Sequence, residues 1–217
     1  MLVEGTIRWQ VVEDCPWDLL MALCLRDLAG LADVARPSLP RVSAPPLPVV
    51  PLASIDSADA VTPALLTRIG GATGGPELAE QWNAWWERIV ERERRSWLPR
   101  PRPPHFEAFD RELALQDLML AHFDRADAWA IEQRRFYAAR AAERMGSRPT
   151  DISDVIRDRE HELRRRAFTF RLDLNVLPLE EPGAWIVAPN TIIVSESLRD
   201  DSASFRSWLT PVIHAIV

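Results

Sequence analysis

The sequence predicts an α+β fold, dominated by helices, with a small antiparallel sheet formed by an N-terminal strand and a C-terminal β-meander. Three observations predict it. Apolar residues recur at helical spacing over long stretches in the middle of the chain. Apolar and polar residues alternate only near the two ends, and a lone strand is not stable without a partner. Strands and helices do not alternate as they do in parallel dinucleotide-binding folds.

These patterns divide the chain into three parts. Residues 1–35 and 150–217 are expected to form an α+β core that contains the sheet. Residues 36–61 are rich in proline and are expected to be extended, because proline lacks an N–H group and fixes φ. Residues 62–149 are expected to form a helical region that packs on the core.

The N-terminal part is predicted to be a strand followed by a helix. Residues 6–12 alternate between apolar and polar side chains, as a half-buried strand does. Asp14 is expected to cap a helix that ends before Gly30, because glycine fits the residue after a helix end. Cys15 and Cys24 are too far apart along this stretch for a disulfide and are expected to be reduced thiols packed in the core.

The middle of the chain is predicted to be helical. A short helix follows Thr62 and stops at the glycine-rich segment 70–75. Pro76 fits the first turn of a helix that is expected to end near residue 98. Residues 105–145 contain neither proline nor glycine. They predict either one long helix or two helices broken around residues 124–127, and we favour a long helix with a kink or break.

Further elements are expected after residue 150. They are a helix over 151–166, strands over 168–176, 185–187 and 192–194, and a final helix capped by Ser202. Pro211 is expected to kink or shorten that final helix. Ser195 is expected to cap the turn that follows the last strand.

Composition argues against several classes of function. No apolar run approaches the roughly 20 residues of a membrane helix, and no basic leader precedes the first apolar stretch, so a cytoplasmic protein without membrane contact is expected. All 26 basic residues are arginine, a bias typical of a GC-rich bacterial genome. The net charge is −6 and the arginine runs are interleaved with or preceded by glutamate, which makes a nucleic-acid partner unexpected. We expect no cofactor, because segment 70–75 lacks the lysine of a phosphate-binding loop.

The clearest functional signal is the helix expected from Pro76. Its three tryptophans cover more of the helix surface than one narrow core seam needs, and arginines follow them. Tryptophan and arginine are enriched at interface hot spots. The alternative is that the same rings pack on the helical segment 105–145. The candidate interaction residues are Trp82, Trp85, Trp86, Trp97, Arg94 and Arg95.

A weaker candidate is a metal site on the helix expected over 151–166. Asp154, Asp158 and His161 lie on one face of that helix, and carboxylates with an imidazole can hold a divalent cation. Ordinary ion pairs with the neighbouring arginines explain the same residues.

No catalytic motif is present. The sequence lacks a GxSxG elbow and an HExxH pair, and the histidines are isolated. The expected function is therefore a non-catalytic protein–protein interaction or assembly protein, a subunit or adaptor of a cytoplasmic complex, with a protein partner or a second copy of itself. The alternative is a hydrolase-type enzyme with a cleft of Asp, Glu, His and Arg between sheet and helices. The sequence leaves the substrate, the partner and the oligomeric state open.

Overall fold

The computed structural model describes residues 1–44, 75–91, 96–147 and 151–217, and the side chains of 145–147 are left out of this description. Its elements are β1 (Leu2–Gly5), β2 (Trp9–Asp14), α1 (Trp17–Leu28), α3 (Pro76–Val90), η2 (Glu107–Phe109), α5 (Leu113–Ser147), α6 (Asp151–Leu163), β3 (Phe170–Leu177), β4 (Ala184–Ala188), β5 (Thr191–Ser195), α7 (Glu196–Asp200) and α8 (Ser202–Ile216). The helix expected after Thr62 and most of the proline-rich segment lie outside the described residues. No described helix is long and apolar enough to span a membrane.

The sheet is mixed, so the predicted antiparallel sheet is wrong in this respect. The strand order is β1-β2-β3-β5-β4. β2 pairs with β3 in parallel and β3 with β5 in parallel, whereas the edge strands β1 and β4 are antiparallel to their neighbours. The chain between β2 and β3 contains the whole helical region and is long enough for a parallel crossover. β5 lies between β3 and β4, so the expected meander does not form.

The first strand forms a hairpin that the sequence pattern did not predict. Ile7 was expected on a buried strand, but it lies at the hairpin tip and is fully exposed. The side-chain oxygen of Thr6 accepts hydrogen bonds from the backbone N–H groups of Arg8 and Trp9 there. Gly5 allows the close approach of the two strands, since a Cβ at this position would lie 2.3 Å from the carbonyl oxygen of Trp9.

The next two helices both begin close to the expected residues, but only the first also ends where expected. α1 follows Pro16, and Asp14 does not cap it. Gly30 adopts a φ of +67° just after the helix end, a left-handed conformation that favours glycine. α3 begins at Pro76 as predicted, but it ends at Val90 and does not reach residue 98.

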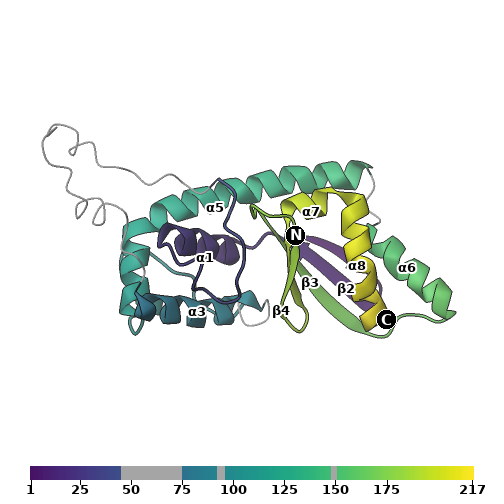
Figure 1. Cartoon of the computed structure of the whole chain (residues 1–217), viewed down its shortest axis with the longest axis horizontal. Helices are drawn as coiled ribbons and strands as arrows, with labels where there is room; N and C mark the ends of the chain where they lie inside the picture. The colour runs from purple at the N-terminus through teal and green to yellow at the C-terminus, as the bar shows by residue number, and fades with distance from the viewer. Residues whose placement is uncertain (45–74, 92–95, 148–150) are drawn as a thin grey trace, which may run out of the picture.

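The region expected to be one or two long helices contains one continuous helix, α5, which begins at Leu113 and not at residue 105. In Figure 1 it runs along the left and upper edges of the molecule, so it reaches from the helical side to the sheet. Near the C-terminus, Asp201 caps α8 in place of Ser202, and Pro211 lies inside α8 without ending it. Ser195 caps α7 as expected.

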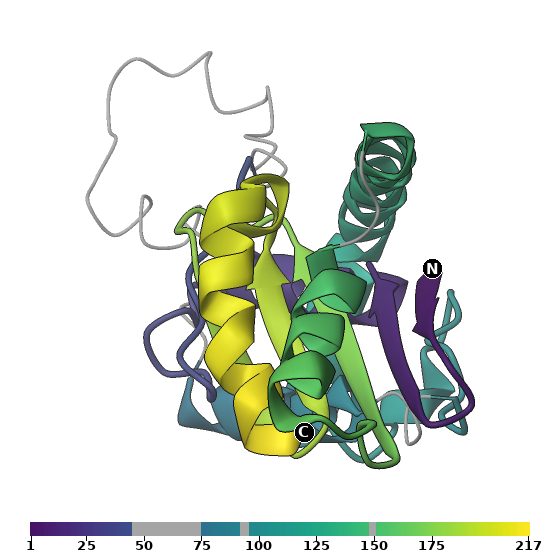
Figure 2. The same cartoon turned by 90° about the vertical axis from the view of Figure 1, so that its right-hand side faces the viewer.

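Two apolar clusters stabilise the fold. The first joins α1, α3 and part of α5, and α1 is its centre because residues 19–26 are buried on every side. The second lies between one face of the sheet and the helices α6 and α8. Figure 2 shows these two helices side by side in front of the sheet. Near the upper edge of the sheet, α5 lies next to the strand end that leads into α1 (Figure 1).

Candidate binding groove

The three tryptophans of α3 lie in the apolar core. Trp82, Trp85 and Trp86 are 0%, 4% and 1% exposed. Trp82 stacks on Trp86 with ring centroids 5.3 Å apart, and its Nε1 donates a hydrogen bond to the carbonyl oxygen of Ala22 at 2.8 Å. Trp82 and Trp86 are therefore enclosed, whereas Trp85, although only 4% exposed, lines a cavity described below. The apolar stripe of α3 had to be covered, and α1 and α5 of the same chain cover it.

Trp97 differs from these three rings. Its exposed fraction is 88%. It lies between Ser96 and Leu98, which both line a cavity described below. Arg94 and Arg95, the other candidate interaction residues, lie outside the described residues.

The structure does not bring the metal candidates together. Asp154 pairs with Arg157 at 2.9 Å and with Arg206 at 3.3 Å, and Asp158 lies 3.8 Å from Arg206. His161 shares a shallow hollow with four arginines, an environment that opposes a cation. Within the described ranges, no group of three or more His, Cys, Asp or Glu side chains is arranged to hold a metal ion. The ion-pair explanation thus accounts for both carboxylates.

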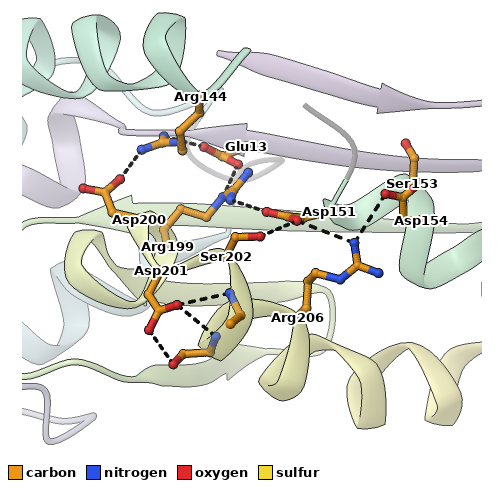
Figure 3. A network of polar contacts seen from close by, with 12 residues as sticks. Glu13, Arg144, Asp151, Ser153, Asp154, Arg199, Asp200, Asp201, Ser202 and Arg206 are labelled. Atoms are coloured by element: carbon orange, nitrogen blue, oxygen red, sulfur yellow. Dashed lines mark hydrogen bonds and ion pairs between the residues drawn. The ribbon is translucent and has the colours of Figure 1, made fainter. Parts of the chain in front are cut away.

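The most extensive polar arrangement is an ion-pair network around Glu13, at the end of β2 (Figure 3). Glu13 is 1% exposed. One carboxylate oxygen accepts a hydrogen bond from Nε of Arg199 at 2.8 Å. The other oxygen accepts from Arg144 at 3.0 Å and from the hydroxyl of Tyr137 at 3.3 Å. A buried carboxylate needs such partners, because an unpaired buried charge is very costly.

The network extends from Glu13 to several helices (Figure 3). Arg144 also pairs with Asp200 at 2.6 Å, and Arg140 binds the same carboxylate. Arg199 lies 3.5 Å from Asp151. These contacts join β2 to α5, α6 and α7, so the network fixes α5 relative to the sheet.

The thiols and the phenol of this region are not activated. Burial raises the pKa of the Cys15 thiol and of the Tyr137 hydroxyl well above their usual values. Burial raises the pKa of Cys24 to about 12. Both cysteines are free and buried, as the sequence predicted. A protonated, buried thiol is a poor nucleophile, so these residues do not indicate cysteine chemistry.

A cavity of about 470 Å³ lies beside the same strand end. Successive strand residues point to opposite faces, and Asp14 lines this cavity whereas Glu13 enters the network. We call it the Trp17 cavity, and its walls include Asp14, Trp17, Trp85, Arg88, Arg100 and Arg134. Its volume is in the range of ligand pockets, roughly 300–1,000 Å³.

The aromatic walls of the Trp17 cavity are held in place. Nε1 of Trp17 donates a hydrogen bond to Asp127 at 2.7 Å. The Trp17 ring also meets Phe123 edge to face, with centroids 6.4 Å apart. Trp85 meets Phe109 in the same way at 5.5 Å. These contacts leave little freedom to lose when a ligand binds.

The cavity carries arginines with few partners. The guanidinium of Arg100 lies 5.7 Å from the centroid of the Trp17 ring. Neither Arg100 nor Arg134 forms an ion pair with any residue that the structure describes. Arg88 pairs with Glu112 at 3.1 Å, but its Nε is buried without a hydrogen-bond partner in the described part of the chain.

A second hollow, of about 480 Å³, adjoins the Trp17 cavity, because Asp14 and Arg134 line both. It lies between β1 and α5, with mainly apolar walls and Arg135 beside them. Its apolar residues include Leu2, Ile131, Ala138, Ala141 and Ala142. We call the two hollows together the Arg134 groove.

A separate hollow of about 360 Å³ lies between α3 and α5 and contains a histidine together with carboxylates. His122 lies there with Glu77 and Asp117. Burial lowers the pKa of the His122 imidazole, and a nearby arginine adds to this effect. Its Nδ1 is buried and has no hydrogen-bond partner among the described residues. A neutral imidazole is thus favoured at this position.

The sequence analysis missed both Glu13 and the groove. The sequence did contain a signal for Glu13. It follows Trp9 and Val11 on the same face of the strand, so a charged residue stands where the pattern expects a buried apolar one. The groove gave no such signal, because its walls come from β1, β2, α1, α3, η2, α5 and the segment 96–101, which are far apart in the sequence. Comparisons with protein-family models, curated proteins and solved structures found no match.

Proposed function

We propose that this chain is a non-catalytic protein–protein interaction or assembly protein, a subunit or adaptor of a cytoplasmic complex, and that it binds its partner in the Arg134 groove. One observation carries the proposal. Fixed aromatic rings and arginines without ion-pair partners among the described residues line two adjoining hollows. Tryptophan and arginine in partly enclosed positions are the residues that dominate the binding energy of interfaces.

Exposed apolar side chains next to the groove support the same function. Trp97 is 88% exposed and Ile131 is 41% exposed. Ile131 lines the groove itself, and Trp97 is flanked by residues that do. Both side chains therefore present apolar surface to solvent at or beside the groove.

The Glu13 network supports the proposal indirectly. α5 supplies one wall of the groove through Arg134, and the same helix is tied to β2 through Tyr137 and Arg144. A wall held by buried ion pairs keeps its shape before the partner arrives. A preformed surface reduces the entropy lost on binding.

The alternative, a hydrolase, has less support from the geometry. The observation that most favours a hydrolase is the hollow that contains His122, Glu77 and Asp117. The carboxylates and arginines between sheet and helices, by contrast, pair with one another. Groups that satisfy each other in this way are not presented to a substrate.

The test begins with the full chain at micromolar concentration. Light scattering after size exclusion measures self-association, and affinity capture measures binding to other proteins. Both are repeated with Arg134→Glu and with Arg111→Glu. Arg111 is an exposed arginine near the start of α5 that lines none of the hollows described above, so its reversal is a matched control.

We expect an association that the wild type and Arg111→Glu share and that Arg134→Glu loses. The proposal fails if the chain is a monomer that retains no partner. It also fails if both charge reversals behave alike. Hydrolysis of a simple ester or phosphoester that disappears in His122→Ala would favour the alternative.

A further inference from the structure

We propose that the Arg134 groove recognises an acidic segment of a partner protein that carries two apolar anchor side chains, one for each hollow. This inference rests on the proposed function and names the chemistry of the partner. It follows from the walls of the two hollows and from the charge between them.

The first anchor is aromatic. Trp17, Trp85 and Phe109 lie in the wall of the Trp17 cavity, but Trp85 and Phe109 are only 4% and 2% exposed. Trp17 is the partly exposed ring of the three, and aromatic pairs prefer edge-to-face and offset arrangements, which suit an incoming ring beside it. A volume of about 470 Å³ also leaves room for a large side chain and part of its backbone.

The second anchor is aliphatic. The hollow beside β1 presents Leu2, Ile131 and three alanines of α5. Small alanine side chains let a neighbouring chain approach the helix closely. β1 is the edge strand of the sheet, and no described strand pairs with its outer side. An extended segment therefore fits along this edge, where backbone hydrogen bonds would add affinity.

The residues between the two anchors are acidic. Arg134 lines both hollows, Arg135 lines the second, and Arg100 lies at the first. The carboxylates in the same walls oppose this charge only in part. Asp14 lies 3.5 Å from the N-terminal ammonium and accepts a hydrogen bond from the backbone N–H of Cys15 at 3.0 Å. Asp18 also has a partner.

The positive charge of the groove, set against the negative net charge of the protein, favours the binding of an acidic segment at this place. The protein has a net charge of −6, so an acidic segment is repelled by most of its surface. The groove contains Arg100, Arg134 and Arg135, which form no ion pair with a described residue, whereas Arg88 is paired with Glu112. Guanidinium groups bind carboxylates through paired hydrogen bonds, which adds geometric specificity to the attraction.

The probe is a set of acetylated, amidated peptides with one tryptophan, then two, three or four glutamates, then one leucine. Binding to the full chain is measured by calorimetry or fluorescence anisotropy. Matched peptides carry glutamine for glutamate, or alanine for tryptophan and leucine. Indole-3-acetate is a further probe, because it tests whether the cavity takes a small planar carboxylate instead of a peptide.

We expect at least one acidic peptide to bind at micromolar concentration and its glutamine counterpart to bind about tenfold more weakly or worse. Arg100→Gln and Arg134→Gln should each weaken the acidic peptide about tenfold, whereas Arg111→Gln should leave it unchanged. The inference is overturned if no peptide binds, if glutamine peptides bind equally well, or if indole-3-acetate alone binds. An association that depends on Arg134 together with any of these failures would leave the proposed function standing.

Discussion

Two regions meet at the end of β2, the Glu13 network and the Arg134 groove, and they use the same kinds of residue in different ways. Glu13 and Asp14 are neighbours in sequence, yet the first is enclosed among arginines and the second lines an open groove. In the network, each guanidinium meets a carboxylate. In the groove, Arg100 and Arg134 meet none among the described residues.

This difference implies that the network residues contribute to stability and the groove residues contribute to binding. A buried charge must be paired within the chain, because nothing else can compensate its loss of water. A charged side chain at the rim of a groove remains hydrated, so it needs no ion pair within the chain and can bind a partner. We therefore expect changes in the network to affect unfolding, and changes in the groove to affect association.

Glu13→Ala should destabilise the protein by about 3–5 kcal/mol, because it removes the carboxylate that lies nearest to the buried Arg199 and leaves only Asp151 at 3.5 Å. The measurement is the free energy of unfolding from urea denaturation. Asp158→Ala is the control, since that side chain is 76% exposed and should change stability by less than about 0.5 kcal/mol. Equal effects of the two variants would show that the network contributes no more than surface charges do.

Glu196→Gln tests how burial of a carboxyl group at the edge of the network affects stability. One oxygen of Glu196 is buried without a hydrogen-bond partner among the described residues, and burial raises the pKa of its carboxyl above the ordinary 4.5. Burial therefore favours the protonated form more in the folded state than in the unfolded state. Its contribution to stability is complete below pH 4.5 and is lost as the pH rises through the raised pKa.

Glutamine cannot ionise, so Glu196→Gln should gain stability relative to the wild type as the pH rises above 4.5. Urea midpoints of both proteins between pH 4 and pH 8 measure this difference. A difference that stays constant over that interval would contradict the effect of burial on this carboxyl.

Arg100→Gln and Arg134→Gln should each change the free energy of unfolding by less than about 0.5 kcal/mol, because neither residue forms an ion pair with a described residue. Their association with the partner or the acidic peptide should fall, as described above. A large loss of stability in either variant would remove the distinction between groove and network.

Trp97→Ala should have the smallest effect on folding, within about 0.5 kcal/mol, because the ring is 88% exposed. Trp82→Ala is the contrasting variant and should cost about 3–5 kcal/mol, since that ring is fully enclosed. Thermal unfolding of the two variants measures both. If Trp97→Ala nevertheless weakens association, the ring belongs to the interface with the partner.

Much of the local structure could be predicted from the sequence. The helices that begin at Pro76 and Asp151, and the strand that begins at Phe170, follow from hydrophobic periodicity, proline and capping signals. The hairpin at the N-terminus could not be predicted in this way, because its first strand has four residues. A segment that short carries too little periodicity to distinguish a strand from a loop.

The candidate site was predicted less well than the fold. The sequence pointed to tryptophan and arginine as the residues of interest, and the groove contains both. It selected Trp82, Trp85 and Trp86, however, and the structure encloses Trp82 and Trp86 and leaves Trp85, at 4% exposure, in the wall of the Trp17 cavity. A wide apolar stripe indicates that another element packs on that face of the helix. The stripe does not reveal whether this element belongs to the same chain or to a partner.

The sequence by itself determined most of the described helices and strands, the start of α3 at Pro76, the end of α1 before Gly30, and the burial of both cysteines. These features depend on contacts between residues near one another in the chain. Only the tertiary structure decided the parallel pairing of β2, β3 and β5, the enclosure of the α3 rings, and the separation of Glu13 from Asp14 into network and groove. These features depend on which distant segments meet, and a one-dimensional pattern does not contain that information.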